Sequence, residues 1–213
     1  MAENVAIGIQ DFSDLIKKNY FYIDKTDFIR EWWESGDSVT LITRPRRFGK
    51  TLNMSMMEQF FSIKYANSGN IFEGLSIWEH EDYHTLQGTY PVISLSFANV
   101  KETNYPDTRK KICMLISELY TNHSFLLKSG ILEESDVEFF RRISVDMDDV
   151  DATMAIHYLC KFLFLYYGNF GTVSVLQCLP SGVLHRFSFG GNRSPATSRL
   201  LLRQPVRSSR FAY

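Results

Sequence analysis

The chain has 213 residues, a length that fits one domain of ordinary size or one domain with a short addition. Hydrophobic residues make up 45% and aromatic residues 15%, which excludes a disordered chain and predicts a buried core. The three cysteines are too few and too widely spaced for a disulfide framework, which favours a reducing compartment. The N-terminus does not resemble a signal peptide, and the most apolar stretch, residues 155–167, is too short to span a bilayer. We therefore expect a cytoplasmic protein with no membrane partner.

The formal net charge of −1 hides an uneven distribution along the chain. All 24 acidic residues lie at or before Asp151, so residues 1–151 carry a net charge of −8 and residues 152–213 carry +7. Such asymmetry is typical either of an acidic domain with a basic nucleic-acid-binding tail or of two parts that differ in origin.

Hydrophobic periodicity predicts alternating helices and strands in the order that follows. A helix is expected over residues 25–35, capped by Asp24 or Thr26 and stopped by Gly36. A buried strand is expected over 38–43 and a helix over 52–63, followed by a strand over 91–97. Three further helices are expected over 107–120, 133–143 and 151–167, and residues 172–179 have the composition of a strand. Strands separated by helices indicate an α/β sheet with parallel pairs.

The segment RPRRFGKT, residues 44–51, has the composition of a phosphate-binding loop between a strand and a helix. Such a loop needs backbone amides that converge on phosphate, a helix N-terminus that favours negative charge, a lysine for the outer phosphates and a hydroxyl for Mg²⁺. Gly49, Lys50 and Thr51 supply these groups, although Arg44 stands where the usual pattern has glycine. The predicted nucleotide-binding residues are Arg44, Pro45, Arg46, Arg47, Phe48, Gly49, Lys50 and Thr51, with Thr51 as the Mg²⁺ ligand.

Other readings of the polar segments are weaker. The four residues 44–47 could be a solvated basic turn, a localisation patch or a nucleic-acid contact. His80, Glu81 and His84 fit the H-E-x-x-H zinc-protease pattern, but the segment is short and two histidines on a solvated helix face explain it better. The aspartates between 146 and 151 lack calcium-loop spacing and are expected to cap the following helix.

Five segments carry a resemblance to a known family: GIQDFSDLIKKNYFYIDKTDFI (8–29), LITRPRRFGKTLNMSMMEQFF (41–61), IFEGLSI (71–77), YPVISLSF (90–97) and FLYYG (164–168). In this order they resemble the predicted AAA-ATPase-like family, whose members often carry a PD-(D/E)XK nuclease-like domain at the C-terminal end. Arg44 in the first glycine position is that family's own version of the loop. The resemblance implies a P-loop NTPase fold in which Gly49, Lys50 and Thr51 bind ATP and Mg²⁺. No nuclease motif occurs in the 213 residues, so that activity is not carried over.

The resemblance ends after residue 168. The family continues with the Walker B element, a hydrophobic strand that ends in Asp-Glu and whose carboxylates hold Mg²⁺ and polarise the attacking water. Here no acidic residue follows Asp151, and residues 169–213 contain six arginines, no lysine, seven serines and three of the six prolines. We therefore predict a partial ATPase-like domain over residues 1–168. Residues 169–213 would be an atypical basic tail, either genuine or produced by a frameshift, or disordered.

The sequence thus predicts an α/β protein with a P-loop NTPase-like parallel sheet flanked by helices and truncated before the Walker B strand. It is expected to bind ATP with Mg²⁺, while hydrolysis is doubtful because no Walker B acid is evident. Three alternatives stay open: a nucleotide-dependent interaction module without turnover, a basic nucleic-acid-binding protein, and a non-functional fragment. The choice between ATP and GTP and the oligomeric state are not predicted.

Overall fold

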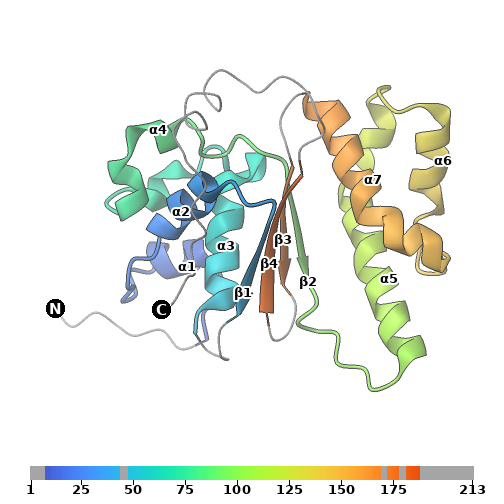
Figure 1. Cartoon of the computed structure of the whole chain (residues 1–213), viewed down its shortest axis with the longest axis horizontal. Helices are drawn as coiled ribbons and strands as arrows, with labels where there is room; N and C mark the ends of the chain where they lie inside the picture. Colours follow the sequence, from blue (N-terminus) through green and yellow to red (C-terminus); the bar gives the residue numbers. More distant parts are fainter. Residues whose placement is uncertain (1–7, 44–47, 169–171, 178–180, 188–213) are drawn as a thin grey trace.

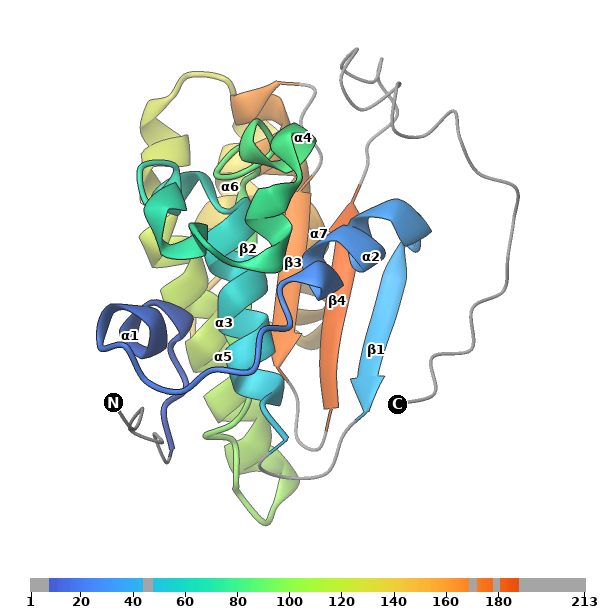
Figure 2. The same cartoon turned by 90° about the vertical axis from the view of Figure 1, so that its left-hand side faces the viewer.

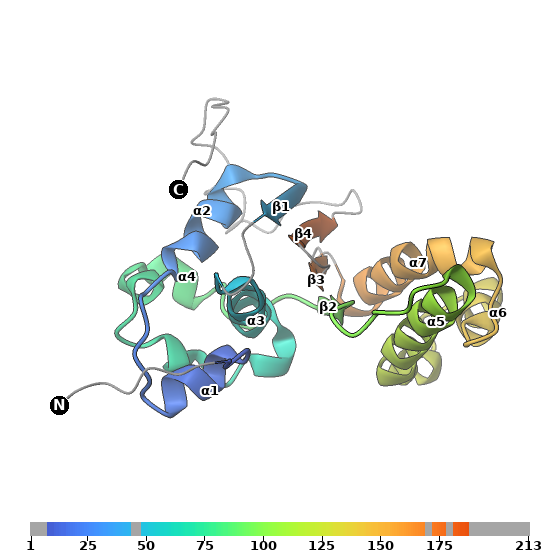
Figure 3. The same ribbon diagram turned by 90° about the horizontal axis from the view of Figure 1, so that it is seen from below.

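The structure is a computed structural model, and it describes residues 8–43, 48–168, 172–177 and 181–187. The helices and strands are α1 (Phe12–Lys17), α2 (Asp27–Ser35), β1 (Val39–Thr43), α3 (Lys50–Phe61), η1 (Ile63–Tyr65), η2 (Gly69–Phe72), η3 (Ser76–Glu79), α4 (Glu81–His84), β2 (Val92–Ser96), α5 (Tyr105–Asn122), η4 (Ser124–Lys128), α6 (Glu134–Arg142), α7 (Asp149–Tyr167), β3 (Thr172–Gln177) and β4 (Ser181–Phe187). They form three layers, with α1 to α4 on one face of a sheet and α5 to α7 on the other (Figures 1 and 3). No helix in the described ranges is both long enough and apolar enough to cross a membrane.

The sheet is mixed, with strand order β1-β4-β3-β2 (Figure 2). Strands β2 and β3 pair in parallel, whereas β4 pairs antiparallel with both β1 and β3. The predicted parallel pairing is found between β2 and β3, and the prediction of a parallel sheet is wrong for the sheet as a whole, because β4 runs antiparallel to both of its neighbours. The physical reason is that only residues 178–180 separate β3 from β4, a connection that can close a hairpin but not a crossover to a parallel strand.

The predicted helices agree with the structure to within about two residues, which is the usual uncertainty of helix ends. Helix α2 stops at Gly36 as expected, and Asp148 caps α7 by accepting a hydrogen bond from the Asp151 N–H. The strand expected over 172–179 is found as β3. The prediction for β1 is wrong in one respect, because Val39 and Leu41 are more than half exposed while Ile42 is buried. As an edge strand of the sheet, β1 has only one face covered by helices.

Two separate hydrophobic cores lie on opposite faces of the sheet. The first unites α1, α2 and α3 with the segment up to Tyr90 and contains Phe12, Trp32, Trp33, Phe60 and Phe61. The second lies among α5, α6 and α7 and includes Ile93 of β2. Because side chains alternate along a strand, Val92 packs on the first core and Ile93 enters the second.

Polar contacts tie the three helices of the second layer together. The Tyr120 hydroxyl of α5 donates to the Ala155 carbonyl of α7 at 2.7 Å, and Lys161 of α7 bonds both carboxylate oxygens of the buried Asp136 in α6. The Arg142 guanidinium donates to both oxygens of Asp151 at 2.9 and 3.0 Å, and this contact holds the pKa of Asp151 below its ordinary value. The bonds of Lys161 and Arg142 join α6 to α7 at two positions, and the Tyr120 bond joins α5 to α7.

Asp24 couples the start of α2 to the distant segment η3. One carboxylate oxygen accepts from the Thr26 N–H and hydroxyl at 2.8 and 2.7 Å, and the other accepts from the Ser76 N–H and hydroxyl at 2.7 and 2.8 Å. The Thr26 hydroxyl also accepts from the Ile77 N–H. Thr26 occupies the N-cap position of α2, but its side chain makes no capping bond, so the expected cap is replaced by a bond between two segments.

We predict that Asp24→Asn lowers the free energy of unfolding at pH 7 by about 1–2 kcal/mol, because an amide accepts fewer and weaker hydrogen bonds than a carboxylate. Burial alone would raise the pKa of Asp24, but the bonds from Ser76 and Thr26 outweigh it and the pKa lies below its ordinary value. The stabilisation is therefore present above about pH 4 and is lost as the pH falls through the folded-state pKa.

Urea unfolding at pH 7 and at pH 3 measures this difference. The gap between wild type and Asp24→Asn should shrink at pH 3, where the wild-type carboxyl is itself becoming protonated. Asp14→Asn is the control, because Asp14 forms only an exposed pair with Lys18 and should change stability by less than about 0.5 kcal/mol. An equal effect of the two substitutions at pH 7 would contradict the role given to Asp24.

Candidate functional site

The candidate site is the junction at which β1 passes into α3. Gly49 is the N-cap residue of α3 and has a left-handed backbone, with φ +75° and ψ 15°. A residue with a Cβ is disfavoured by its own backbone in this region, whereas glycine is not. An added Cβ at Gly49 would meet no atom within 4 Å, so the backbone conformation rather than crowding requires glycine here.

Lys50 and Thr51 form the first turn of α3 and are half-buried. This 12-residue helix points its N-terminus toward the end of the sheet at which β1 ends, so the positive end of its dipole lies there. The structure thus brings Gly49, Lys50 and Thr51 together as the sequence predicts. Phe48 lies beside them and is 59% exposed. The predicted loop residues Arg44, Pro45, Arg46 and Arg47 lie outside the described residues.

Thr51 borders a small hollow of about 130 Å³ between α3 and the end of β2. Ser55 and Glu58 follow Thr51 on the same face of α3, and Ser94 and Ser96 line the hollow from β2. The Ser55 hydroxyl already accepts hydrogen bonds from the Phe12 N–H and the Gln59 side-chain amide, and Glu58 lies about two helical turns from Thr51. The Thr51 hydroxyl is an oxygen ligand of the kind that Mg²⁺ prefers, so this residue fits one position of a hydrated magnesium ion. Sequence reasoning missed Glu58, although it lies seven residues after Thr51 and three after Ser55, a spacing that places it on the same helix face.

The strands that run parallel to β1 end at the same side of the sheet as the α3 N-terminus. An acid for phosphate chemistry would be expected directly after one of them, as in the Walker B element. The sequence continues from β2 with Phe97, Ala98 and Asn99, and from β3 with Cys178. Neither strand therefore ends in a carboxylate, and Glu58 is the acid that lines the hollow beside Thr51.

The histidines of the rival zinc pattern make other contacts. His84 stacks on Trp78 with ring centroids 4.1 Å apart, and its Nε2 lies 2.8 Å from the Trp78 carbonyl oxygen. His80 lies 3.8 Å from a carboxylate oxygen of Asp27, at the start of α2. Within the described part of the chain, no three His, Cys, Asp or Glu side chains gather in a way that could hold a metal ion. These histidines therefore pack against neighbouring surface residues.

Comparison with known proteins identifies the family. The family model described as "Predicted AAA-ATPase" matches residues 6–154, which is more than half of the chain. The chain belongs to this AAA-ATPase-like family. The match includes β1, the Gly49 junction, α3 and β2, and it ends within α7, before β3 and β4.

The chain is similar to "Uncharacterized protein in vnfD 5'region" from Azotobacter chroococcum mcd 1, to which it is 31% identical over 116 residues. The aligned part is 54% of this chain and 21% of the relative, so the chain spans about a fifth of that protein's length. No solved structure matches the chain. Family membership thus supports the junction as the candidate site, and the activity of the longer relatives is not transferred.

We predict that Gly49→Ala and Gly74→Ala each lower the free energy of unfolding by about 1 kcal/mol, because both positions are left-handed. Gly74, at φ +78°, is a matched control, since an added Cβ there also meets no atom within 4 Å. Only Gly49→Ala should also weaken Mg-ATP binding, by at least about tenfold. Equal binding by the two variants in calorimetry would show that the Gly49 conformation serves the fold alone.

Proposed function

We propose that the protein binds ATP together with Mg²⁺ at the N-terminal end of α3, with residues 44–51 as the phosphate-binding loop. The observation that carries the proposal is the left-handed Gly49 between a strand and a 12-residue helix, followed at once by Lys50 and Thr51. This is the structural context that a P-loop needs. Membership of a family described as predicted ATPases supports the same ligand.

Each residue type at the junction has a role in this proposal. The backbone N–H groups at the start of α3 donate to phosphate oxygens, and Lys50 places its ammonium group on the outer phosphates. The Thr51 hydroxyl is the protein's ligand to Mg²⁺, an ion that neutralises charge on the phosphates when it is bound. Arg44, Arg46 and Arg47 add positive charge to the loop and favour a polyphosphate over a neutral ligand.

A nucleotide-dependent interaction module without turnover is the second candidate, and one observation favours it. Hydrolysis needs a carboxylate that positions the attacking water, and neither β2 nor β3 is followed by one in the sequence. Glu58 lies seven residues beyond Thr51, roughly 10 Å along the helix axis, which is too far to replace an acid at the end of a neighbouring strand. We therefore infer that this chain binds ATP but hydrolyses it slowly or not at all.

We predict that Lys50→Ala weakens Mg-ATP binding at least about 30-fold, because it removes a charged donor to phosphate worth about 2 kcal/mol or more. Titration calorimetry on the purified chain measures the change. Lys17→Ala is the control of equal charge, since Lys17 lies exposed on α1, and its affinity should stay within about twofold of wild type.

Different results would redirect the proposal. No binding by a chain that melts cooperatively would overturn the nucleotide site. An equal loss in Lys50→Ala and Lys17→Ala would indicate general electrostatic attraction. Binding of duplex DNA that falls steeply with salt and needs residues 44–47 would instead favour the nucleic-acid reading.

We predict that single-turnover release of phosphate from bound ATP is slower than about 0.01 s⁻¹, well below the rate of about 1 s⁻¹ or more that is usual for enzymes. Excess protein over radiolabelled ATP reports the chemical step without interference from product release. Lys50→Ala is the background control. Release at about 1 s⁻¹ that is lost in Lys50→Ala would show that this chain is a working ATPase. An acid elsewhere than directly after β2 or β3 would then position the attacking water.

A further inference from the structure

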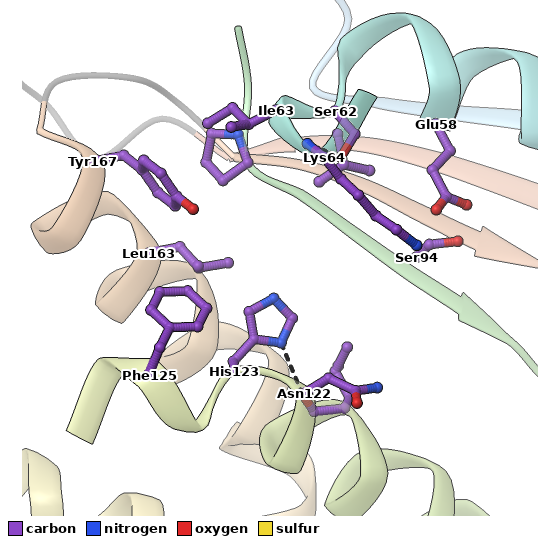
Figure 4. A pocket seen from close by; sticks show the side chains of 13 residues that line it. Glu58, Ser62, Ile63, Lys64, Ser94, Asn122, His123, Phe125, Leu163 and Tyr167 are labelled. Atoms are coloured by element: carbon purple, nitrogen blue, oxygen red, sulfur yellow. Dashed lines mark hydrogen bonds between the residues drawn. The ribbon is translucent and has the colours of Figure 1, made fainter. Parts of the chain in front are cut away.

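A second and larger hollow, of about 570 Å³, lies at the outer edge of β2 (Figure 4). Glu58 and Lys64 line it from the layer of α3 and η1. His123, Phe125 and Tyr167 line it from the layer of α5, η4 and α7. Side chains of both helical layers therefore border one hollow, and the imidazole ring of His123 lies among them.

His123 occupies the point at which α5 passes into η4. It is the C-cap residue of α5, and its carbonyl oxygen accepts a hydrogen bond from the Leu126 N–H at 3.0 Å. Its ring Nδ1 lies 2.8 Å from the carbonyl oxygen of Leu119, one turn back in α5. Phe125 of η4 meets Tyr166 of α7 edge to face, with ring centroids 5.1 Å apart. His123 thus connects the end of α5 to a segment that packs on α7.

The two nitrogens of the His123 ring have different surroundings. A carbonyl oxygen can only accept, so the contact with Leu119 requires a hydrogen on Nδ1, and Nε2 of the neutral ring then carries a lone pair. Figure 4 shows Nε2 directed into the hollow, on the side of the ring away from this contact. Protonation of the ring therefore adds a hydrogen and a positive charge inside the hollow.

The groups around the hollow determine how well that charge is tolerated. The ammonium group of Lys64 on η1 opposes a second positive charge, whereas the carboxylate of Glu58 on α3 favours it. Tyr167 on α7 is neutral, because burial raises the pKa of its hydroxyl above the ordinary value. The lining residues that β2 contributes are not titratable. Burial dominates at His123 itself and lowers the pKa of its ring, although the bond at Nδ1 acts in the opposite direction.

We propose that His123 is a pH-sensitive switch, which packs the end of α5 and η4 against α7 when its ring is neutral and releases them when the ring is protonated. Bulk water stabilises the charged ring more than the hollow does, so the ring turns outward. This movement breaks the contact between Nδ1 and the Leu119 carbonyl and removes the support beside Phe125, whose ring lies 6.0 Å from that of His123. The second core then opens locally, while the first core, on the other face of the sheet, stays closed.

The direction of the pH effect follows from the lowered pKa. A histidine in an unfolded or locally opened chain has a pKa of about 6.5, and His123 in the packed state has a lower one. Its neutral ring therefore stabilises the packed state fully above about pH 6.5, and this stabilisation is lost as the pH falls through the folded-state pKa. The switch is closed at pH 7.5 and opens on the acid side of about pH 6.5.

Hydrogen exchange measured by mass spectrometry at pH 7.5 and pH 5.0 tests the switch, with rates corrected for the intrinsic pH dependence of amide exchange. Peptides from residues 119–128 should exchange at least about fivefold faster at pH 5.0, whereas peptides from residues 54–61 of α3 should change less than about twofold. The His123→Asn variant should lose this difference, because its amide can donate to the Leu119 carbonyl but cannot gain a proton. His157→Asn is the matched control, since His157 is exposed on α7 and does not line the hollow, and it should respond as the wild type does.

Three results would overturn the proposal. The first is an equal acceleration in wild type and His123→Asn, and the second is an equal acceleration of residues 54–61 and 119–128, which would indicate that the whole chain opens. The third is a His123 ring that titrates above about pH 6.5 in the folded chain, which an NMR titration of the wild type measures without any variant. If His123→Asn does not fold, the midpoint of that titration should coincide with the midpoint of the change in exchange at residues 119–128, and two separate midpoints would contradict the switch.

Discussion

Helix α3 is buried along most of its length, with Met54, Met56, Met57, Phe60 and Phe61 all inside the first core. It contacts α1 on one side and β2, β3 and β4 on the other. Its C-terminal end is held by aromatic contacts, in which Phe61 stacks on Trp33 at 5.4 Å and meets Trp32 and Tyr90 edge to face. A helix anchored in this way has little freedom to slide or tilt, so its N-terminus and the Gly49 turn are fixed at the end of β1. The position of the candidate site therefore depends on this packing.

The same helix contributes to both hollows described above. Glu58 and Ser94 line the small hollow beside Thr51 as well as the large one at the edge of β2. A charge placed in either hollow therefore changes the electrostatic environment of the other through Glu58. The two hollows therefore share one carboxylate on the same helix.

Periodicity in the sequence was sufficient to predict the longer helices and the strands β1, β2 and β3, because each has one dominant apolar face or a β-branched run. Gly49, Lys50 and Thr51 could be placed because their chemistry depends on neighbours in the chain. The antiparallel course of β4 could not be predicted, since it lies in a segment whose basic composition resembles a tail. The bond from the Ile77 N–H to the Thr26 hydroxyl and the proximity of Glu58 to Ser94 could not be predicted either, because both join residues that lie far apart in the sequence. The exposed face of β1 escaped for a similar reason, since strand composition does not reveal an edge position.

The two cores draw on nearly consecutive stretches of chain, the first on residues 12–90 and the second on residues 93–163. Folding during synthesis can therefore bury each core soon after its residues leave the ribosome. Strand β1 is the exception, because its partner in the described sheet is β4, which follows β1 by more than 130 residues. Until β4 is synthesised, both edges of β1 lack a strand partner from the described sheet. The nascent chain thus carries an unpaired strand until β4 has been synthesised, and protection by a chaperone would matter most in that interval.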